Sequence, residues 1–499
     1  MKRIITAILA ASLCLTAYSQ AALRSYVQEL NQKEPLKSSV WGVLAVRMNG
    51  DTLVAFNQGQ KMVPASNTKL ITTGSALTLL GADYRFHTAI AYDGEVKDST
   101  LVGDVYIIGG GDPTLGSKDE NAEPADRLFG RWQKILADAG IYRIEGDIIG
   151  DGRRMDCYGE NFSWTVDDLG WYYGVGTSAL NWYENRQDFF TVPGTSVGDP
   201  VSVSVIYPKT PWMKYSHSCT TSPAGCGDEL YYLNSRFVPI GEMRGTLAVD
   251  KGTRKQECSN RFPALTCAAY FMEYLQDHGT SVSGSYADID NDGAVRHDPM
   301  VFDGRRAATA QDGLTIAGST ASPKLSDIIK ECLYESDNFY AEALLKAIGQ
   351  EVTECASYDS SLVAEKKILT GLGLSPDTAV QIVDGSGLSR KNYITPSFFV
   401  DFLKAMMRTS QYETYLHLLP QPGKGTLTSR LSKAPESLRG RVWMKSGSMN
   451  GVRCFSGYIT PEDGKTENTI VFSVMTNNVT VPTYQVNLIM DKIITLIGE

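Results

Sequence analysis

Apolar residues recur in short β-type runs at both ends of the chain. Near the N-terminus, residues 40–46 and 52–56 are separated by an Asn-Gly turn, which predicts a hairpin. Near the C-terminus three further runs of this kind follow one another, at residues 441–445, 452–459 and 469–475. Residues 484–497 then place apolar side chains at helical spacing. We therefore expect one sheet of five strands drawn from both chain ends, with the last helix packed on it.

The middle of the chain follows a different pattern. Between Gly81 and about Ala307, short β-like runs alternate with turns rich in Gly, Asp, Asn and Pro, which predicts inserted β-rich structure. From Leu325 to Ile348 the apolar residues return to helical spacing. A chain of 499 residues is long enough for two or three domains arranged in this way.

The first 20 residues have the pattern of a secretory signal peptide. Two basic residues precede an apolar run over residues 4–15, and small residues follow near a cleavage point between Ser19 and Ala22. The alternative is a transmembrane anchor, but the run is shorter than the roughly 20 residues that span a bilayer. We therefore expect an exported chain with no transmembrane anchor.

Charge and the content of histidine and cysteine limit the partners, metal sites and disulfides that we expect. Loss of Lys2 and Arg3 with the signal takes the net charge from −9 to −11, and no basic run remains to bind nucleic acid. Five histidines and no CxxC motif leave little to build a zinc site, so we expect no metal and no cofactor. Export permits disulfides among the remaining cysteines, with buried free thiols as the alternative. Three pairs are close enough in sequence to bond, Cys219 with Cys226, Cys258 with Cys267, and Cys332 with Cys355.

The segment Ser66-Asn67-Thr68-Lys69 opens an apolar helical run that ends at Gly81. Helical spacing of three places Ser66 and Lys69 on one face. A serine hydroxyl is a poor nucleophile until a neighbour accepts its proton, and a lysine can do so when burial or nearby cations lower its pKa. The helix start adds backbone N–H groups and positive potential where an oxyanion would form. Alone the motif is weak, but it occurs once in this chain.

Two further polar motifs follow along the chain. Ser336-Asp337-Asn338 interrupts a helical stretch, which predicts a loop between two helices. Lys445-Ser446-Gly447-Ser448 lies at the predicted end of a strand. The glycine there would let a substrate backbone approach the strand edge, and the lysine and hydroxyls would suit a carboxylate. Taken singly, either motif is also compatible with an ordinary turn or an edge lysine.

In this order, and in helix, loop and strand contexts, the three motifs resemble the S-x-x-K, S-x-N and K-[ST]-G set of penicillin-binding proteins and serine β-lactamases. The chain more specifically resembles the D-alanyl-D-alanine carboxypeptidases of the low-molecular-mass class C penicillin-binding proteins, because 266 residues separate Lys69 from Ser336. One departure is a serine in place of the commoner threonine of K-T-G, which keeps the hydroxyl. The resemblance extends to residues 109–115, 146–151, 171–185 and 384–389.

The resemblance implies an α+β fold. It predicts a β-lactamase/transpeptidase-like catalytic domain, a five-stranded antiparallel sheet flanked by helices, with two inserted, mainly β-rich domains. The expected boundaries are residues 21–90 and 306–499 for the catalytic domain, 91–111 and 200–305 for inserted domain II, and 112–199 for inserted domain III.

The resemblance also implies a reaction. We expect a periplasmic serine-type D-Ala-D-Ala carboxypeptidase and/or D-alanyl endopeptidase that acts on peptidoglycan stem peptides and is acylated by β-lactam antibiotics. Ser66 would attack the carbonyl of the penultimate D-alanine and Lys69 would accept its proton. Ser336 would relay a proton to the leaving amine, and Asn338 would hold Lys69 and the substrate amide. Alternatives of the same fold are a β-lactamase or a catalytically silent wall-binding protein.

The strand motif would bind the other end of the substrate. By the same resemblance, Lys445, Ser446 and Ser448 would receive the terminal carboxylate beside Gly447. The backbone N–H groups of Ser66 and Ser448 would form the oxyanion hole. The Lys445 cation would also help to keep Lys69 neutral.

Three competing motifs carry weaker signals. Residues 194–198 match the G-x-S-x-G elbow around Ser196, but a strand rather than a helix is expected after them. Residues 288–293 open like a calcium loop, but Pro299 occupies the place of the bidentate glutamate. The glycines at 109–111 precede Asp-Pro rather than a helix with lysine, so they predict no phosphate site.

Overall fold

A computed structural model describes residues 21–30, 32, 34–156, 159–289, 293–300, 304–309 and 313–499. The predicted signal peptide at residues 1–20 lies outside this part. The chain divides into two compact units. Unit 1 comprises the residues up to Ala82 together with Ile329–Leu345 and Leu362–Glu499, and unit 2 comprises Asp83–Ile328 and Lys346–Ser361.

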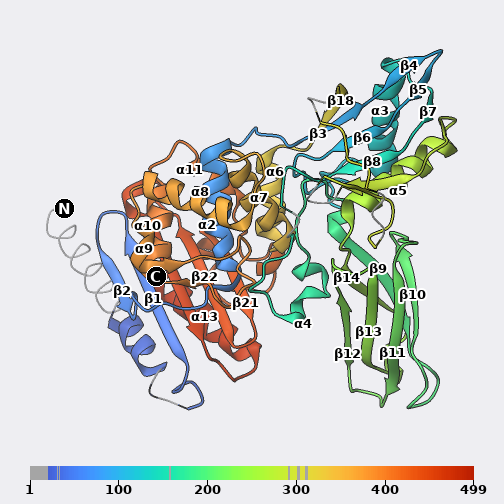
Figure 1. Cartoon of the computed structure of the whole chain (residues 1–499). Helices are drawn as coiled ribbons and strands as arrows, with labels where there is room; N and C mark the ends of the chain where they lie inside the picture. The colour runs from blue at the N-terminus through green and yellow to red at the C-terminus, as the bar shows by residue number, and fades with distance from the viewer. Residues whose placement is uncertain are drawn as a thin grey trace. The chain divides into compact units, whose positions relative to one another are not determined.

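Unit 1 is built on an antiparallel sheet of five strands in the order β2-β1-β23-β22-β21 (Figure 1). The strands are β1 (Val40–Arg47), β2 (Thr52–Phe56), β21 (Val442–Met449), β22 (Val452–Ile459) and β23 (Ile470–Asn477). Strand β1 pairs along its whole length with β23 from the other end of the chain. The predicted sheet is therefore confirmed. Strand β21 runs on past Lys445 to Met449, so the lysine motif lies within an edge strand and not at its end.

Helices cover both faces of this sheet. The helices of unit 1 are α2 (Thr68–Leu80), α6 (Leu325–Tyr334), α7 (Asn338–Gln350), α8 (Tyr358–Gly371), α9 (Pro376–Ala379), α10 (Pro396–Met406), α11 (Tyr412–Leu418), α12 (Glu436–Arg439) and α13 (Thr483–Gly498). The boundary between the two units falls within α6, α7 and α8. Helix α10 packs on β1, β22 and β23. On the other face, Val486 and Ile493 of α13 share an apolar core with Val27 and with Phe472 of β23. The amphipathic C-terminal helix predicted at residues 484–497 is confirmed.

Unit 2 contains four sheets among its described residues, one of six strands and three of three or four. They have the strand orders β17-β16-β8-β6-β3-β18, β15-β7-β5-β4, β10-β9-β14 and β11-β13-β12. Their strands are β3 (His87–Tyr92), β4 (Glu95–Lys97), β5 (Thr100–Val102), β6 (Val105–Ile108), β7 (Arg143–Glu145), β8 (Ile148–Asp151), β9 (Arg186–Val192), β10 (Ser202–Tyr207), β11 (Lys214–Ser222), β12 (Asp228–Asn234), β13 (Ile240–Ala248), β14 (Arg254–Ser259), β15 (Ser281–Val282), β16 (Tyr286–Ile289), β17 (Val295–Arg296) and β18 (Thr315–Ala321). The insertion is β-rich, as predicted, and its division into two domains stays a prediction.

Two long helices of unit 2, α3 (Ala125–Asp138) and α5 (Pro263–Asp277), were not among the predicted elements. They meet through aromatic rings, since Phe129 of α3 lies 5.4 Å from Phe271 of α5 between ring centroids. Phe129 also stacks on Trp182 at 4.8 Å. These rings form the centre of the largest apolar core in unit 2.

The predicted disulfides do not form in the described part of the chain. Cys219, Cys226, Cys258, Cys267 and Cys332 are free thiols, so all three suggested pairings are wrong. Cys258 and Cys267 belong to two different apolar cores, which explains why closeness in sequence does not bring them together. The Cys219 thiol instead donates to the Met243 carbonyl oxygen at 3.2 Å.

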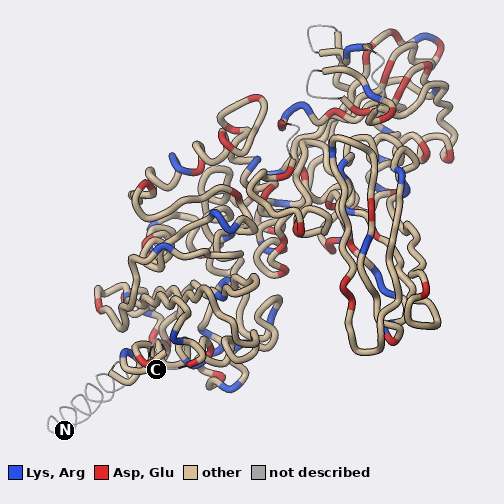
Figure 2. Tube along the Cα trace, turned by 60° about the horizontal axis from the view of Figure 1, so that its bottom comes forward, with Lys and Arg blue, Asp and Glu red and all other residues tan. Residues whose placement is uncertain are grey.

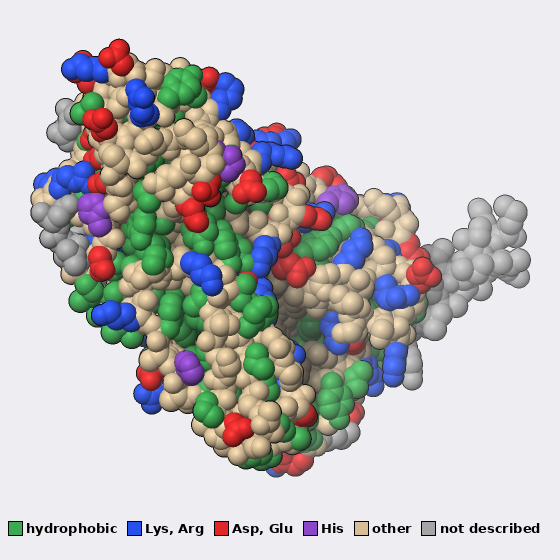
Figure 3. Space-filling view, turned by 90° about the vertical axis from the view of Figure 1, so that its right-hand side faces the viewer, with side chains coloured by type: hydrophobic (Ala, Val, Ile, Leu, Met, Phe, Trp, Pro, Cys, Tyr) green, Lys and Arg blue, Asp and Glu red, His purple; other side chains and the backbone are tan. Residues whose placement is uncertain are grey.

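The surface is mixed in charge. Lys and Arg residues alternate with Asp and Glu along both units (Figure 2). On the face of unit 2 seen in Figure 3, hydrophobic side chains are interspersed with charged ones. No helix in the described ranges is both long and apolar enough to cross a membrane.

Candidate active site

Ser66 lies in the short helix η1 (Ala65–Asn67), which runs directly into α2. The preceding Ala65 is buried and has a φ of 47°, a left-handed conformation that is strained for alanine. The Asn67 amide fixes η1 to the sheet, because it donates to Ser456 Oγ of β22 at 2.8 Å. The predicted position of the serine at a helix start is confirmed.

Lys69 is fully buried one helical turn after Ser66. Its Nζ lies 3.0 Å from Ser66 Oγ, 2.6 Å from Asn338 Oδ1 and 2.9 Å from the Ser386 carbonyl oxygen. The two carbonyl oxygens can only accept hydrogen bonds. When Lys69 is neutral, its two N–H groups therefore donate to them, and its lone pair is left to accept the Ser66 proton. This is the geometry that the predicted role of Lys69 as the base for Ser66 requires.

Burial lowers the pKa of Lys69 from its ordinary value, while the neighbouring acids Asp337, Glu342 and Asp384 oppose this shift. Burial also lowers the pKa of Lys445 well below its ordinary value, and the Lys69 cation adds to the effect. The two lysines thus disfavour a doubly charged state. Desolvation is what favours neutral Lys69, whereas the expected help from the Lys445 cation stays a prediction.

The Ser336 motif forms the predicted loop between two helices, α6 and α7. Ser336 itself has a φ of 61°, and its Oγ accepts a hydrogen bond from Lys445 Nζ at 2.8 Å. The Asp337 carboxylate accepts from the Tyr340 N–H at 2.8 Å and so caps the start of α7. Asn338 is the first residue of that helix and faces Lys69. Residues from all three motifs therefore meet in one place.

Strand β21 supplies the third side of the site. Gly447 comes so close to η1 that a Cβ there would lie 2.6 Å from the Pro64 carbonyl oxygen and 3.0 Å from the Asn67 nitrogen. The sequence predicted a glycine for close approach of a substrate. The structure shows that the glycine also lets strand β21 contact residues 64–67, which contain Ser66 and are called the serine segment below. The Lys445 Nζ donates to the Ser446 carbonyl oxygen at 2.8 Å, which holds it along the strand.

Two residues at this site were not anticipated. Thr426 lies 2.9 Å from Ser446, hydroxyl to hydroxyl, and Arg453 donates to Ser448 Oγ. Arg453 pairs with Ser448 in the β21–β22 register. The Asn-Gly turn between these strands could have predicted that pairing, whereas no sequence signal singled out Thr426.

The loop of residues 384–389 forms the floor under Lys69. Glu342 of α7 accepts the N–H groups of Gly385 and Ser386 at 3.0 and 2.8 Å, and so fixes the Ser386 carbonyl that binds Lys69. Asp384 accepts from two further N–H groups of the same loop. The sequence marked this loop only as part of the family resemblance and gave it no role.

Two buried glutamates near this loop, Glu342 and Glu365, have raised pKa values. Burial raises the pKa of Glu342 to about 7, with the Asp384 charge acting in the same direction. Burial and the Glu342 charge raise the pKa of Glu365 to about 8. Protonation of these acids reduces the negative charge beneath Lys69 and thereby favours its neutral form.

The other motifs singled out in the sequence form no comparable site among the described residues, and residues 290–292 of the calcium-like motif lie outside that part of the chain. Ser196 lies in an exposed turn between β9 and β10, so no helix follows it as an esterase elbow requires. Asp288 binds Arg296 through both carboxylate oxygens, at 2.7 and 2.6 Å. Across the described ranges, no group of three or more His, Cys, Asp or Glu side chains could hold a metal ion.

Known proteins with a related sequence or fold cover nearly the whole chain. The profile of the D-Ala-D-Ala carboxypeptidase 3 (S13) family matches residues 23–496. A D-alanyl-D-alanine carboxypeptidase of Actinomadura sp. (strain R39) is 29% identical over 468 residues, or 91% of this chain and 81% of that relative. The D-alanyl-D-alanine carboxypeptidase DacB of Haemophilus influenzae is 25% identical over 452 residues, or 88% of this chain and 86% of that relative.

A solved structure supports the fold. The crystal structure of penicillin binding protein 4 (dacB) from Haemophilus influenzae matches 95% of this chain and 98% of its own, with a TM-score of 0.77 and 21% identity. The predicted fold class, a transpeptidase-like catalytic part within a multi-sheet α+β architecture, is confirmed.

Proposed function

Because the chain belongs to the D-Ala-D-Ala carboxypeptidase 3 (S13) family, we propose that it is a periplasmic serine hydrolase that removes terminal D-alanine from peptidoglycan stem peptides, cleaves D-alanyl cross-links, or does both. The observation that carries this proposal is the environment of Lys69 Nζ. It lies 3.0 Å from Ser66 Oγ and has two carbonyl oxygens as its other partners. Ser66, Lys69, Ser336, Asn338 and Lys445 all lie in unit 1.

The reaction begins with acylation. Neutral Lys69 accepts the Ser66 proton as Oγ attacks the carbonyl carbon of the penultimate D-alanine. The amide C–N bond then breaks, and the leaving amine takes a proton through Ser336, which hydrogen-bonds Lys445. The product is an ester between Ser66 and the shortened peptide. A water molecule then hydrolyses this ester and restores the free serine.

The strand motif positions the substrate. Lys445, Ser446 and Ser448 receive the carboxylate beyond the scissile bond, and β21 offers an edge along which an extended peptide can lie. The N–H groups of Ser66 and Ser448 stabilise the oxyanion, and such a donor is typically worth about 3 kcal/mol. β-Lactams, which also carry a carboxylate beside a reactive amide, acylate the same serine.

The test uses purified mature protein with two substrates, an uncross-linked pentapeptide and a cross-linked dimer muropeptide, followed by mass spectrometry. We expect loss of one D-alanine, splitting of the dimer, or both. Penicillin should add its mass to the peptide that contains Ser66. Persistence of the adduct distinguishes this enzyme from a β-lactamase, which would release hydrolysed penicillin rapidly.

The matched variants are Ser66→Ala and Ser196→Ala, the second being an exposed serine in unit 2. We expect the first to lose turnover and penicillin labelling and the second to keep both. Labelling that survives in Ser66→Ala would place the nucleophile elsewhere. A folded wild-type protein that turns over neither muropeptide would contradict the proposed function.

A further inference from the structure

A pocket of about 360 Å³ lies in unit 1 at the end of the strand that carries the lysine motif. Its wall is formed by residues 448–453, which connect β21 to β22, and by residues 479–481, Thr483 and Val486 around the start of α13. All of these residues belong to the described part of the chain. Because Ser448 is also part of the proposed active site, the pocket adjoins that site. Its volume is large enough for a side chain or a short piece of a ligand.

Arg453 is the one charged residue among those that line this pocket. Its guanidinium group donates to Ser448 Oγ, to the carbonyl oxygens of Val452 at 2.8 Å and Met449 at 3.3 Å, and to Thr483 Oγ1 at 2.9 Å. All four acceptors are uncharged. No aspartate or glutamate of the described chain forms an ion pair with Arg453. The half-buried cation therefore has hydrogen-bond partners but no counter-charge.

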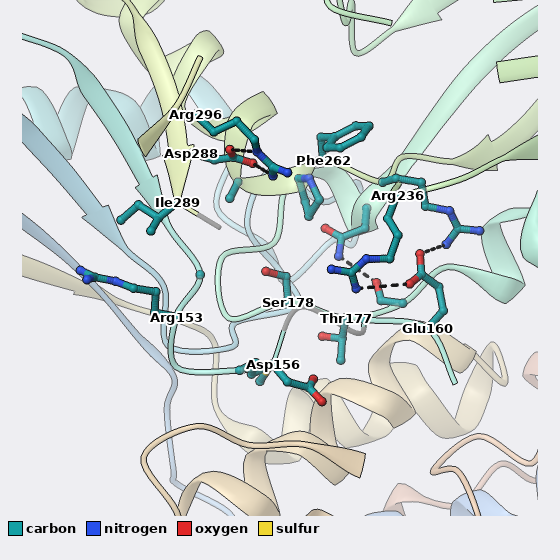
Figure 4. Close-up of a pocket in the computed structure, with 18 of the residues that line it drawn as sticks. Arg153, Asp156, Glu160, Thr177, Ser178, Arg236, Phe262, Asp288, Ile289 and Arg296 are labelled. Carbon is teal, nitrogen blue, oxygen red and sulfur yellow. Dashed lines mark hydrogen bonds and ion pairs between the residues drawn. The ribbon is translucent and has the colours of Figure 1, made fainter. Parts of the chain in front are cut away.

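Two arginines elsewhere show the usual arrangement. In the unit 2 pocket of Figure 4, Arg296 binds Asp288 through both carboxylate oxygens, at 2.7 and 2.6 Å. In unit 1, Arg430 lies 3.4 Å from Asp491. At Arg453, by contrast, burial lowers the pKa of the guanidinium group, and the Arg430 cation acts in the same direction. An anion bound beside Arg453 would oppose this shift, so the pocket favours an anionic ligand.

The neutral groups of the wall suit a carboxylate in particular. Ser448, Thr480 and Thr483 present exposed hydroxyls, and Asn450 adds an exposed amide. Each of these groups can donate a hydrogen bond to a carboxylate oxygen. Helix α13 begins at Thr483 and has neither a side-chain cap nor an acidic residue in its first turn. Its positive end therefore adds to the field of Arg453.

The proposed roles of the strand motif give the direction in which the substrate lies. In the proposed reaction the scissile carbonyl lies at the N–H of Ser448, and the side chains that bind the carboxylate of the leaving D-alanine extend from there back to Lys445. The part of the stem peptide that precedes the scissile bond must then continue the other way, past Met449 to the turn. This acyl side is also the part that stays attached to Ser66 in the ester. The pocket is consequently placed to contact the acyl side of the substrate.

We infer that Arg453 is a specificity-determining residue, which binds a carboxylate of the stem peptide on the acyl side of the scissile bond. A guanidinium group recognises a carboxylate through charge and through a fork of N–H donors, and the hydroxyls around it supply further donors. The inference rests on the proposed function for the direction of the substrate. It adds that the enzyme selects acidic stem peptides over neutral ones, apart from the carboxylate that Lys445 binds.

The experiment measures kcat/KM for release of D-alanine from three pentapeptides by the purified full chain. The parent is L-alanyl-γ-D-glutamyl-meso-diaminopimelyl-D-alanyl-D-alanine, which has two carboxylates on the acyl side. In the second peptide the glutamyl carboxylate is a carboxamide, and in the third the diaminopimelyl carboxylate is. We expect one of the two amides to be cleaved at least about tenfold less efficiently than the parent. The amide that shows this ratio identifies the carboxylate that Arg453 binds.

Two variants and a control assign the ratio to Arg453. Arg453→Gln should bring it close to one, because the new side chain carries no charge. Arg453→Lys, which keeps the charge but not the fork, should give an intermediate ratio. The control Arg408→Gln removes an exposed arginine of unit 1, and with it the same net charge, and should keep the wild-type ratio. Because a ratio is independent of the folded fraction, it stays informative if Arg453→Gln is less stable.

Equal kcat/KM for all three peptides with the wild type would overturn the inference and leave the proposed function intact. A wild-type ratio in Arg453→Gln would also overturn it, as would loss of the ratio in Arg408→Gln, since net charge would then set the preference. A folded wild-type protein that releases D-alanine from none of the peptides and is not labelled by penicillin would contradict the proposed function itself.

Discussion

Replacement of Gly447 by alanine tests whether contact between strand β21 and the serine segment determines catalysis. The added Cβ would lie 2.6 Å from the Pro64 carbonyl oxygen and 3.0 Å from the Asn67 nitrogen. Both partners are backbone atoms and cannot rotate away, so strand and segment must move apart by several tenths of an ångström. Such overpacking typically costs about 1–3 kcal/mol of stability.

The substitution should slow catalysis as well as lower stability. Ser66 lies between the two contacted residues, while Lys445 lies on the strand that must move. A misplacement of about 1 Å between reacting groups costs about 10²-fold in rate. We therefore expect Gly447→Ala to acylate with fluorescent penicillin about 10- to 100-fold more slowly than wild type. Its unfolding midpoint should fall by roughly 2–12 °C, because a cost of about 1–3 kcal/mol shifts the midpoint by roughly 2–4 °C per kcal/mol in a domain of this size.

Gly440→Ala is the matched control. Its φ is −68°, and a Cβ there would meet only the Glu436 carbonyl oxygen at 3.7 Å, an ordinary contact. This variant should acylate at the wild-type rate and be no less stable. Wild-type acylation by Gly447→Ala with an unchanged unfolding midpoint would refute the claim that this glycine sets the position of Ser66.

Three further predictions concern the floor and walls of the site. Since burial lowers the pKa of Lys69, the rate at which fluorescent penicillin acylates the wild type should rise with pH through that lowered pKa and then reach a plateau. In the same assay Lys69→Arg, whose side chain stays charged, should be acylated at least about 10²-fold more slowly at every pH. Burial raises the pKa of Glu365 from 4.5 to about 8, so its contribution to stability is present below pH 4.5 and is lost as pH rises through 8. Glu365→Gln should flatten the decline of the unfolding midpoint over this interval, and an equally steep decline would contradict the assignment. Ser336→Ala should lower kcat for D-alanine release by about 10²- to 10⁴-fold, and an unchanged kcat would exclude the proton relay.

Periodicity predicted the catalytic sheet because its strands are regular and each is local in sequence. The amphipathic helix α3 shows the limit of such patterns. Its buried residues Leu128, Trp132 and Leu136 follow helical spacing, but the turn-rich composition around them favoured strands. Composition over a long window thus outweighed a short periodic signal, and the helix was missed.

The sequence motifs identified residues that the fold brings together, and the catalytic roles of these residues stay predictions. The contact of Lys69 with Asn338 joins residues 269 apart and followed from the family resemblance, not from spacing. The roles of Glu342 and Thr426 depend on which side chains the fold brings beneath or beside the motifs, and no local pattern encodes this. The suggested pairing of Cys258 with Cys267 was wrong for a similar reason, because the two residues pack in different apolar cores.

The pairing of β1 with β23 has a consequence for how the enzyme matures. Val63 and Asn477, which hydrogen-bond beside this pair, are 414 residues apart in the chain. Contacts of such long range form late, whereas unit 2 draws most of its residues from one continuous segment and can assemble earlier. Ser66 depends on β21 and β22 for its position, so we expect a nascent chain to have neither hydrolytic activity nor a penicillin target until its final strands have been synthesised and paired. The topology thereby makes activity conditional on completed synthesis.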